Sequence, residues 1–337
     1  MPFIPELPIS SPARDGCELL DSSCPVPSLP LPAGPCPSIP CPALPVNTTS
    51  PSHPVTCSPC GTAYTNPCPA VCTNSTARSN HILARTADNL ILTCGGESPI
   101  GTDDMTCVVL DPEAGEWLPH STLDRPRVMA TAITLPSLGL MVMGGFKQLT
   151  TSVLPTGSTE WQAGPPLPGV FDKTSYYGVC SVLLSETNLL LIGGGTDSII
   201  PGTRVAEYSE GAWMEWPSLY TSRWGHACAR LGDKVIIAGG VSPFFTLLST
   251  TTVLDLETRE ARETGEMSVA RTWFGMANMG GRLVVVGGMG PLRNAWGDVE
   301  EWVEEEEVWV AREQNMATAM SSFASLVISS EDVCMKE

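Results

Sequence analysis

Five short apolar runs, each ending in a pair of glycines, recur along the chain at nearly equal intervals. Their first glycines stand at 95, 144, 193, 239 and 287, so successive copies are 49, 49, 46 and 48 residues apart. An apolar run this short, rich in Val, Ile and Leu, predicts a strand buried on both faces. The paired glycines permit backbone conformations that are closed to other residues. A period of about 50 residues with one buried strand in each repeat predicts a β-propeller. The five runs are residues 90–96, 140–146, 189–194, 235–240 and 283–288.

Each repeat also carries an arginine 16 or 17 residues before its double glycine. These arginines are Arg78, Arg127, Arg223 and Arg271, and Tyr177 and Met320 take the equivalent place in two other repeats. A tryptophan precedes two of the arginines by ten residues. The order of marks predicts four strands in each repeat, with the double glycine after the second strand.

The double glycine and the spaced aromatic residue resemble the marks of the kelch repeat, over residues 78 to 337. The resemblance implies an all-β kelch-type propeller, and the six arginine-type marks predict about six four-stranded blades. The sixth blade has only one full strand, residues 322–328, which predicts that it is incomplete or shared between the chain termini. Because open strand edges are avoided in soluble sheets, we expect residues 57–77 to pack on this blade, with Cys334 near their cysteines.

Residues 1–77 differ from the repeats in composition, which predicts two regions, 1–77 and 78–337. The first region holds 18 of the 31 prolines and eight of the 13 cysteines. Proline at this density fixes φ and removes backbone donors, so we expect a largely irregular, extended segment. The Cys57/Cys60 and Cys68/Cys72 pairs favour a cross-linked knot over a zinc site, because prolines interrupt both pairs.

Cysteines and glycosylation motifs bear on the compartment. The two N-glycosylation motifs, at Asn47 and Asn74, both lie in the proline-rich region. Together with 13 cysteines they favour an oxidising, extracellular environment. The first residues lack the basic and apolar regions of a signal peptide, which leaves a cytoplasmic location as the alternative.

Two cysteine pairs in the repeats are candidates for bonding. Cys94 ends the second strand of the first repeat and Cys107 begins the third, so a disulfide between these antiparallel neighbours is predicted. Cys180 and Cys228 lie on consecutive inner strands. A bond between them and two free buried thiols are equally favoured.

The sequence shows no sign of an enzyme, a metal site or a cofactor. A net charge of −18 without a basic stripe argues against nucleic acid. No apolar run is long enough to span a membrane. The four histidines and five tyrosines form no cluster of the copper-oxidase kind, and His226 is interpreted as a structural residue. The acidic run 298–307, with seven carboxylates, is interpreted as a solvated sheet edge rather than a calcium site.

Function is therefore argued from the loops. Loops of different length on rigid sheets are typical of a binding surface, and Phe244, Phe245 and Trp296 are the candidate contact residues. Arg127, Arg223 and Arg271 should ring one rim, either tying blades together or facing an acidic partner. We expect a monomeric, non-enzymatic propeller, secreted or at the cell surface, that binds a protein. The alternatives are the recognition part of a cullin ubiquitin-ligase adaptor and a copper-oxidase-like enzyme.

Overall fold

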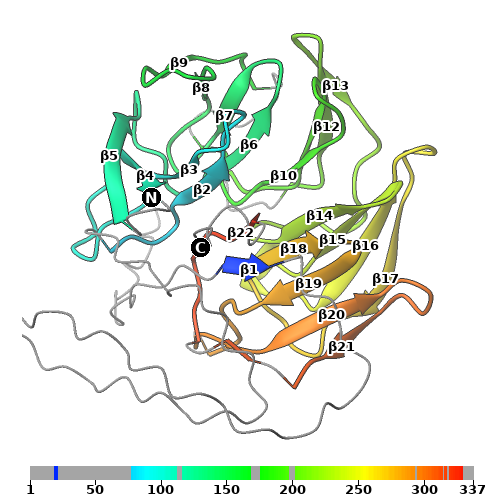
Figure 1. Cartoon of the computed structure of the whole chain (residues 1–337). Coiled ribbons are helices and arrows are strands. Elements are labelled where there is room, and N and C mark those ends of the chain that lie inside the picture. The colour runs from blue at the N-terminus through cyan, green and yellow to red at the C-terminus, as the bar shows by residue number, and fades with distance from the viewer. Residues whose placement is uncertain are drawn as a thin grey trace, which may run out of the picture.

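The computed structural model describes residues 77–111, 116–167, 175–196, 202–292, 294–313, 315–316 and 319–328, and the backbone of 19–21. Its strands form five four-stranded antiparallel sheets and one two-stranded parallel sheet. The sheets are arranged around a central axis as the blades of a propeller (Figure 1). The predicted all-β propeller is thereby confirmed.

Each blade is a simple up-and-down sheet in chain order. Blade 1 comprises β2 (Ile82–Arg85), β3 (Ile91–Cys94), β4 (Thr106–Asp111) and β5 (Glu116–Thr122); blade 2 comprises β6 (Thr131–Leu135), β7 (Gly139–Met143), β8 (Thr151–Leu154) and β9 (Gln162–Ala163). Blade 3 comprises β10 (Cys180–Leu183), β11 (Leu189–Ile192), β12 (Val205–Ser209) and β13 (Ala212–Glu215). Blade 4 comprises β14 (Ala227–Leu231), β15 (Lys234–Ala238), β16 (Thr250–Asp255) and β17 (Ala261–Glu266); blade 5 comprises β18 (Gly275–Met279), β19 (Arg282–Val286), β20 (Val299–Val303) and β21 (Val308–Ala311).

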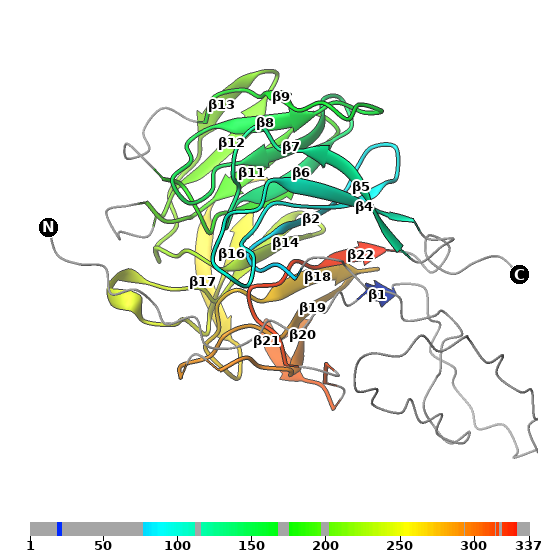
Figure 2. The same cartoon turned by 90° about the vertical axis from the view of Figure 1, so that its left-hand side faces the viewer.

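The number of blades differs from the expected six, because the described residues form only five four-stranded sheets. The sixth place in the ring holds β22 (Leu326–Ile328), which pairs in parallel with β1 (Leu19–Asp21). β22 contacts the inner strands β18 and β2, and Figure 2 shows β1 and β22 side by side next to β18. We call residues 319–328 together with β1 the sixth sector.

The segment expected to complete the sixth blade cannot be placed. Residues 57–76 and Cys334 lie outside the described residues, as do Asn47 and Asn74. The described strand that pairs with β22 comes instead from residues 19–21. The predicted boundary between residues 77 and 78 stays a prediction.

The hydrophobic core lies between neighbouring blades. In blades 1, 2 and 3 the second strand is buried throughout, since every residue of β3, β7 and β11 is buried. Separate buried clusters fill the space between blades 1 and 2, 2 and 3, 3 and 4, and 4 and 5. The burial on both faces that the apolar runs predict is therefore observed.

Candidate functional site

The recurrent arginines hold the double glycines in place. Arg127 Nη1 donates to Gly144 O at 2.8 Å, and Arg223 Nη1 donates to Gly239 O at 3.1 Å. The second glycine of each pair bonds to the next blade, as where Gly96 N donates to Arg127 O at 2.9 Å. Arg127, Arg223 and Arg271 therefore each bond their own blade through the guanidinium group and the preceding blade through the carbonyl oxygen.

These arginines are buried and do not form a ligand-facing ring. Arg127, Arg223 and Arg271 have no exposed surface. Arg271 also pairs with Asp298 and with Glu300, which is itself fully buried. Burial lowers the pKa of both Arg127 and Arg223 to about 10. Since their guanidinium groups bond the protein's own carbonyls and carboxylates, we assign them a structural role in place of partner contact.

The tyrosine that replaces the arginine in the third repeat is Tyr176, not Tyr177. The Tyr176 hydroxyl donates to Gly193 O at 2.7 Å, the contact that an arginine makes elsewhere. Tyr176 lies 17 residues before its glycine and Tyr177 lies 16, and both spacings occur in other repeats. Spacing alone therefore left the wrong residue of the pair as the candidate.

A closed ring of backbone hydrogen bonds surrounds the axis. Its members are the residues two positions after Arg78, Arg127, Tyr176, Arg223, Arg271 and Met320. Each N–H donates to the carbonyl of the preceding member: Met129 to Asn80 at 3.0 Å, Gly178 to Met129 at 2.9 Å, Gly225 to Gly178 at 2.8 Å, Trp273 to Gly225 at 2.9 Å, Ser322 to Trp273 at 3.0 Å and Asn80 to Ser322 at 2.8 Å. All six residues have positive φ, between 53° and 62°. We call these six residues the axial ring. Because the six residues are of five different types, no pattern in the sequence revealed them.

One arc of aromatic side chains follows the axial ring from blade 2 to blade 5. The ring of Phe146 packs edge-on against Tyr177 at 5.8 Å between centroids, Tyr177 against Trp224 at 5.6 Å, and Trp224 against Trp273 at 5.5 Å. These three contacts have interplanar angles of 63–76°, a geometry that aromatic pairs favour. The positions 146, 177, 224 and 273 have no constant spacing, so the repeat did not reveal them.

The loops that follow the double glycines surround this arc and carry exposed apolar side chains. They extend the sheets on the side where the inner strands begin, as the bridges Trp224–Val241 and Thr272–Met289 show. We call the exposed apolar residues of these loops the apolar rim. Its members, with their exposed fractions, are Ile100 (84%), Phe146 (42%), Phe244 (93%), Phe245 (66%) and Leu292 (91%).

The three predicted contact residues differ in their exposure. Phe244 and Phe245 form a 3-10 turn (Pro243–Phe245) at a loop tip, and both have positive φ, 68° and 60°. Ser242 N donates to Thr246 O at 2.8 Å and closes the turn beneath them. Trp296, in contrast, is half-buried, with its indole against Gly290. Of these three residues, the phenylalanine pair alone is presented at a tip.

A pocket of about 110 Å³ lies on the axis inside the apolar rim. The axial ring lines it, together with the residues that directly follow five members of the ring in sequence. Two of these are His81 and His226, whose pKa values burial lowers to about 4 and about 3, with the nearby Arg78 and Arg223 adding to the effect. The His226 imidazole packs against Gly193, as Phe274 packs against Gly239, which supports its interpretation as a structural residue.

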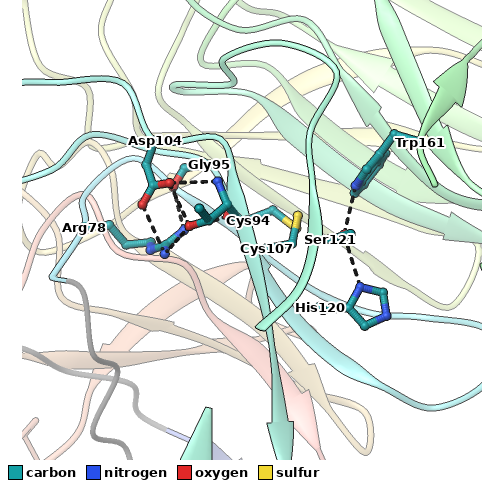
Figure 3. The surroundings of a disulfide bond; sticks show 9 residues. Arg78, Cys94, Gly95, Asp104, Cys107, His120, Ser121 and Trp161 are labelled. Atoms are coloured by element: carbon teal, nitrogen blue, oxygen red, sulfur yellow. Dashed lines mark hydrogen bonds and ion pairs between the residues drawn. A yellow bond between two sulfur atoms is a disulfide. The ribbon is translucent and has the colours of Figure 1, made fainter. Parts of the chain in front are cut away.

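Two disulfides join strands around the axis. Cys94 and Cys107, paired in the sequence prediction, are directly opposite on β3 and β4 and are bonded to each other. Figure 3 shows this bond beside Arg78, which bonds Gly95 O and Asp104. Cys180 and Cys228 are also bonded, which decides between the two alternatives for that pair. Their bond connects the inner strands of blades 3 and 4.

The acidic run is largely ion-paired rather than merely solvated. Glu304 pairs with Lys234 at 3.1 Å, and Glu307 pairs with Arg262, both partners belonging to blade 4. Hydrogen bonding to Arg262 lowers the pKa of Glu307 to about 2. Glu301 pairs with Arg282 within blade 5 at 2.6 Å. The run therefore helps to join blades 4 and 5.

No cluster of metal-ligating side chains gathers in the part of the chain that is described. Those residues contain no group of three or more His, Cys, Asp or Glu that could hold a metal ion. His120 lies away from the other two described histidines, with Nδ1 3.1 Å from Ser121 Oγ (Figure 3). Among the same residues, no helix is long and apolar enough to cross a membrane.

The molecule thus belongs to the β-propellers by its fold. Among 320 solved chains that match its structure is one described as "Structure of YjhT", with a TM-score of 0.60. The two sequences are 13% identical, over 70% of this chain and 84% of that chain. Identity this low shows a shared fold alone. Searches of protein-family models and of curated proteins found no match.

Proposed function

We propose that this chain is a non-enzymatic, protein-binding propeller of the kelch type that contacts its partner through the apolar rim. The observation that carries the proposal is the set of exposed apolar side chains on one face. Ile100, Phe244 and Leu292 are each more than four-fifths exposed, and they come from three different blades. Exposed apolar residues gathered on one face are typical of protein–protein contact sites.

The conformation of the phenylalanine pair supports this assignment. Positive φ at a bulky residue costs about 1–2 kcal/mol, and Phe244 and Phe245 adopt it in succession. Neither ring is buried, so packing within the chain does not offset that cost. Strain of this kind concentrates at sites of ligand contact, where the structure holds groups ready for binding.

We place the protein outside the cell or at its surface. Four cysteines of the propeller are joined as Cys94–Cys107 and Cys180–Cys228. Disulfides persist in oxidising compartments and are rare in the cytosol. Mapping the thiols in protein from its natural source tests the location, and all four cysteines found as free thiols would contradict it.

The contact surface is tested by partner capture with matched variants. The full chain and its Phe244→Ala/Phe245→Ala variant are used as bait in medium or membrane extract, with quantitative mass spectrometry. We expect the variant to recover at least tenfold less of a specific partner, because a buried aromatic contact contributes about 2 kcal/mol or more to affinity. The melting temperature should stay unchanged, since both rings are exposed.

The control replaces exposed apolar residues elsewhere. Leu118 on β5 and Val310 on β21 are 42% and 39% exposed and lie outside the loops of the rim. The Leu118→Ser/Val310→Ser variant should recover the partner as well as the unchanged chain does. Equal loss in both variants, or none in the phenylalanine variant, would reject the apolar rim as the contact surface.

A further inference from the structure

The axial pocket has a preformed aromatic wall. A Cβ added to Gly178 or to Gly225 would lie 3.1 Å from the indole of Trp273, so this ring covers both glycines of the axial ring. Trp273 is itself held in a left-handed conformation, with φ of 54°, by hydrogen bonds on either side. Phe323, the next residue after Ser322, also lines the pocket. The wall is therefore fixed by backbone geometry before any ligand arrives.

Among the described residues, no charged side chain lines the pocket. Its polar side chains are those of Asn80, His81, His226 and Ser322. Burial and the nearby arginines lower both imidazole pKa values, which keeps the two rings neutral at physiological pH. A charged group that entered this space would lose hydration without gaining an ion pair, at a cost of several kcal/mol. The pocket therefore favours an uncharged occupant.

Asn80 supplies a carboxamide on the side of blade 1, next to His81. Its Oδ1 atom is buried and accepts no hydrogen bond from the described residues. Rotation about the terminal torsion of an asparagine exchanges its oxygen and nitrogen at low cost. The side chain can therefore offer the pocket a donor or an acceptor, which is the complement of another carboxamide.

The pocket is open on one side, so its volume limits the part of a ligand that it can enclose. An apolar cavity of about 150 Å³ takes benzene, with six heavy atoms. The axial pocket, at about 110 Å³, is somewhat smaller. A short aliphatic body that ends in an amide fits within this limit and matches both walls.

We propose that the axial pocket binds an uncharged carboxamide with a short aliphatic body, of the kind carried by a glutamine side chain. The aliphatic part packs on Trp273 and Phe323, and the amide bonds to Asn80. The inference rests on the proposed function only for the source of this group, which is then an anchoring residue of the bound protein. The chemistry of the pocket stands independently of that partner.

The test compares three small probes of similar shape and different charge. Isobutyramide, isobutyrate and isobutylammonium are titrated into the full chain at pH 7, with saturation-transfer NMR as the readout. We expect isobutyramide to bind with a Kd of about 1–10 mM, or about −3 to −4 kcal/mol, which is well within the ceiling for a ligand of six heavy atoms. The anion and the cation should bind at least tenfold more weakly, because neither finds a counter-charge.

Variants at two asparagines with the same backbone conformation locate the site. Asn80→Gly removes the amide and tolerates the φ of 53°, so the fold is retained. We expect this variant to bind isobutyramide about five- to tenfold more weakly. Asn89, with φ of 67°, lies in the turn between β2 and β3, outside the axial pocket, and Asn89→Gly should bind as the unchanged chain does.

Three outcomes would overturn the inference: no binding of isobutyramide at tens of millimolar, equal binding of a charged probe, or equal loss in both glycine variants. The Phe244→Ala/Phe245→Ala variant should bind isobutyramide normally, since its substitutions lie in a rim loop. Failure of amide binding therefore leaves the partner-capture result intact. Failure of partner capture likewise leaves the amide result intact.

Discussion

The junction between two full blades and the junctions of the sixth sector both hold the ring together, but they use different bonds. Between blades 3 and 4, the Cys180–Cys228 disulfide and the buried His226 supplement the hydrogen bond from Gly194 N to Arg223 O. In the sixth sector, residues 319–328 form no side-chain hydrogen bond, ion pair or disulfide with another described residue. Its junctions rely on backbone bonds, such as Gly288 N to Met320 O at 2.8 Å. Backbone geometry common to all sectors closes the ring, and side chains strengthen it selectively.

Equivalent positions make this comparison testable. Met320 stands where four of the five full blades have an arginine, and Phe323 stands where blade 4 has His226. The pair equivalent to Cys180 and Cys228 is Gly275 with Ser325 at the junction of blade 5 and the sixth sector. Replacing a residue of a full blade by its equivalent in the sixth sector therefore measures how much that side chain contributes to the free energy of unfolding.

The largest effect is expected for Arg271→Met, which installs the residue found at position 320. The change leaves the fully buried Glu300 and the nearby Asp298 without their cation. Removal of one partner of a buried ion pair costs about 3–5 kcal/mol. Urea denaturation should show this loss in the free energy of unfolding. A loss below about 1 kcal/mol would mean that the arginine adds little to the backbone junction.

The disulfide between blades 3 and 4 should give the next largest effect. Its cysteines are 48 residues apart, and closing a loop of this length stabilises by about 2–4 kcal/mol. We expect Cys180→Ala/Cys228→Ser to lose that amount in urea denaturation under non-reducing conditions.

A second variant supplies the control for the disulfide. Thr131 and Ser181 hold the equivalent positions between blades 2 and 3, and their hydroxyl oxygens are 2.7 Å apart. Cys180→Thr/Cys228→Ser should therefore regain about 1 kcal/mol through a similar hydrogen bond. Equal stability of the two variants would show that this hydrogen bond adds nothing at the junction.

The smallest effect concerns acid stability. The pKa of His226 is about 3 in the folded chain, against 6.5 for an unperturbed imidazole, so only the unfolded chain binds this proton at pH 5. Stability is therefore complete above pH 6.5 and falls by about 1.4 kcal/mol per pH unit below it for each such histidine. His226→Phe, which copies Phe323, should remove one of the two contributions, leaving that of His81.

The measurement is the free energy of unfolding between pH 6.5 and pH 5, where most carboxylates stay ionised. Halving of the slope in His226→Phe is the expected result. A slope equal to that of the unchanged chain would place the acid sensitivity elsewhere. His120→Phe serves as the control, because His120 lies outside the axial pocket.

The periodic features were predictable and the features that vary between repeats were not. The double glycines mark the end of the second strand in each repeat. They recur because each first glycine has positive φ, such as 68° at Gly95, which other residues adopt only at a cost. The number of blades was wrong because Met320 marks a sixth inner strand without three further strands of its own among the described residues. Cys94 and Cys107 were foreseen because antiparallel neighbours place them opposite each other.

The candidate site was foreseen only in part. Phe244 and Phe245 were found from an apolar loop, whereas Trp273 was missed because its role depends on Gly178 and Gly225 in other blades. The acidic run was taken as solvated because its partners, Lys234 and Arg262, are distant in sequence. Contacts between repeats leave no local pattern, so they become visible only in three dimensions.

The axial ring has an electrostatic consequence for the mouth of the propeller. Its six hydrogen bonds run head to tail in one rotational sense, so each peptide dipole points toward the next around the circle. Dipoles arranged in this way polarise one another, yet their vector sum across the axis is close to zero. A helix terminus concentrates partial charge on its unpaired groups, but a closed circle has no terminus. The axial ring itself therefore adds little net field at the axis, and what it contributes to selection there is shape and hydrogen bonding.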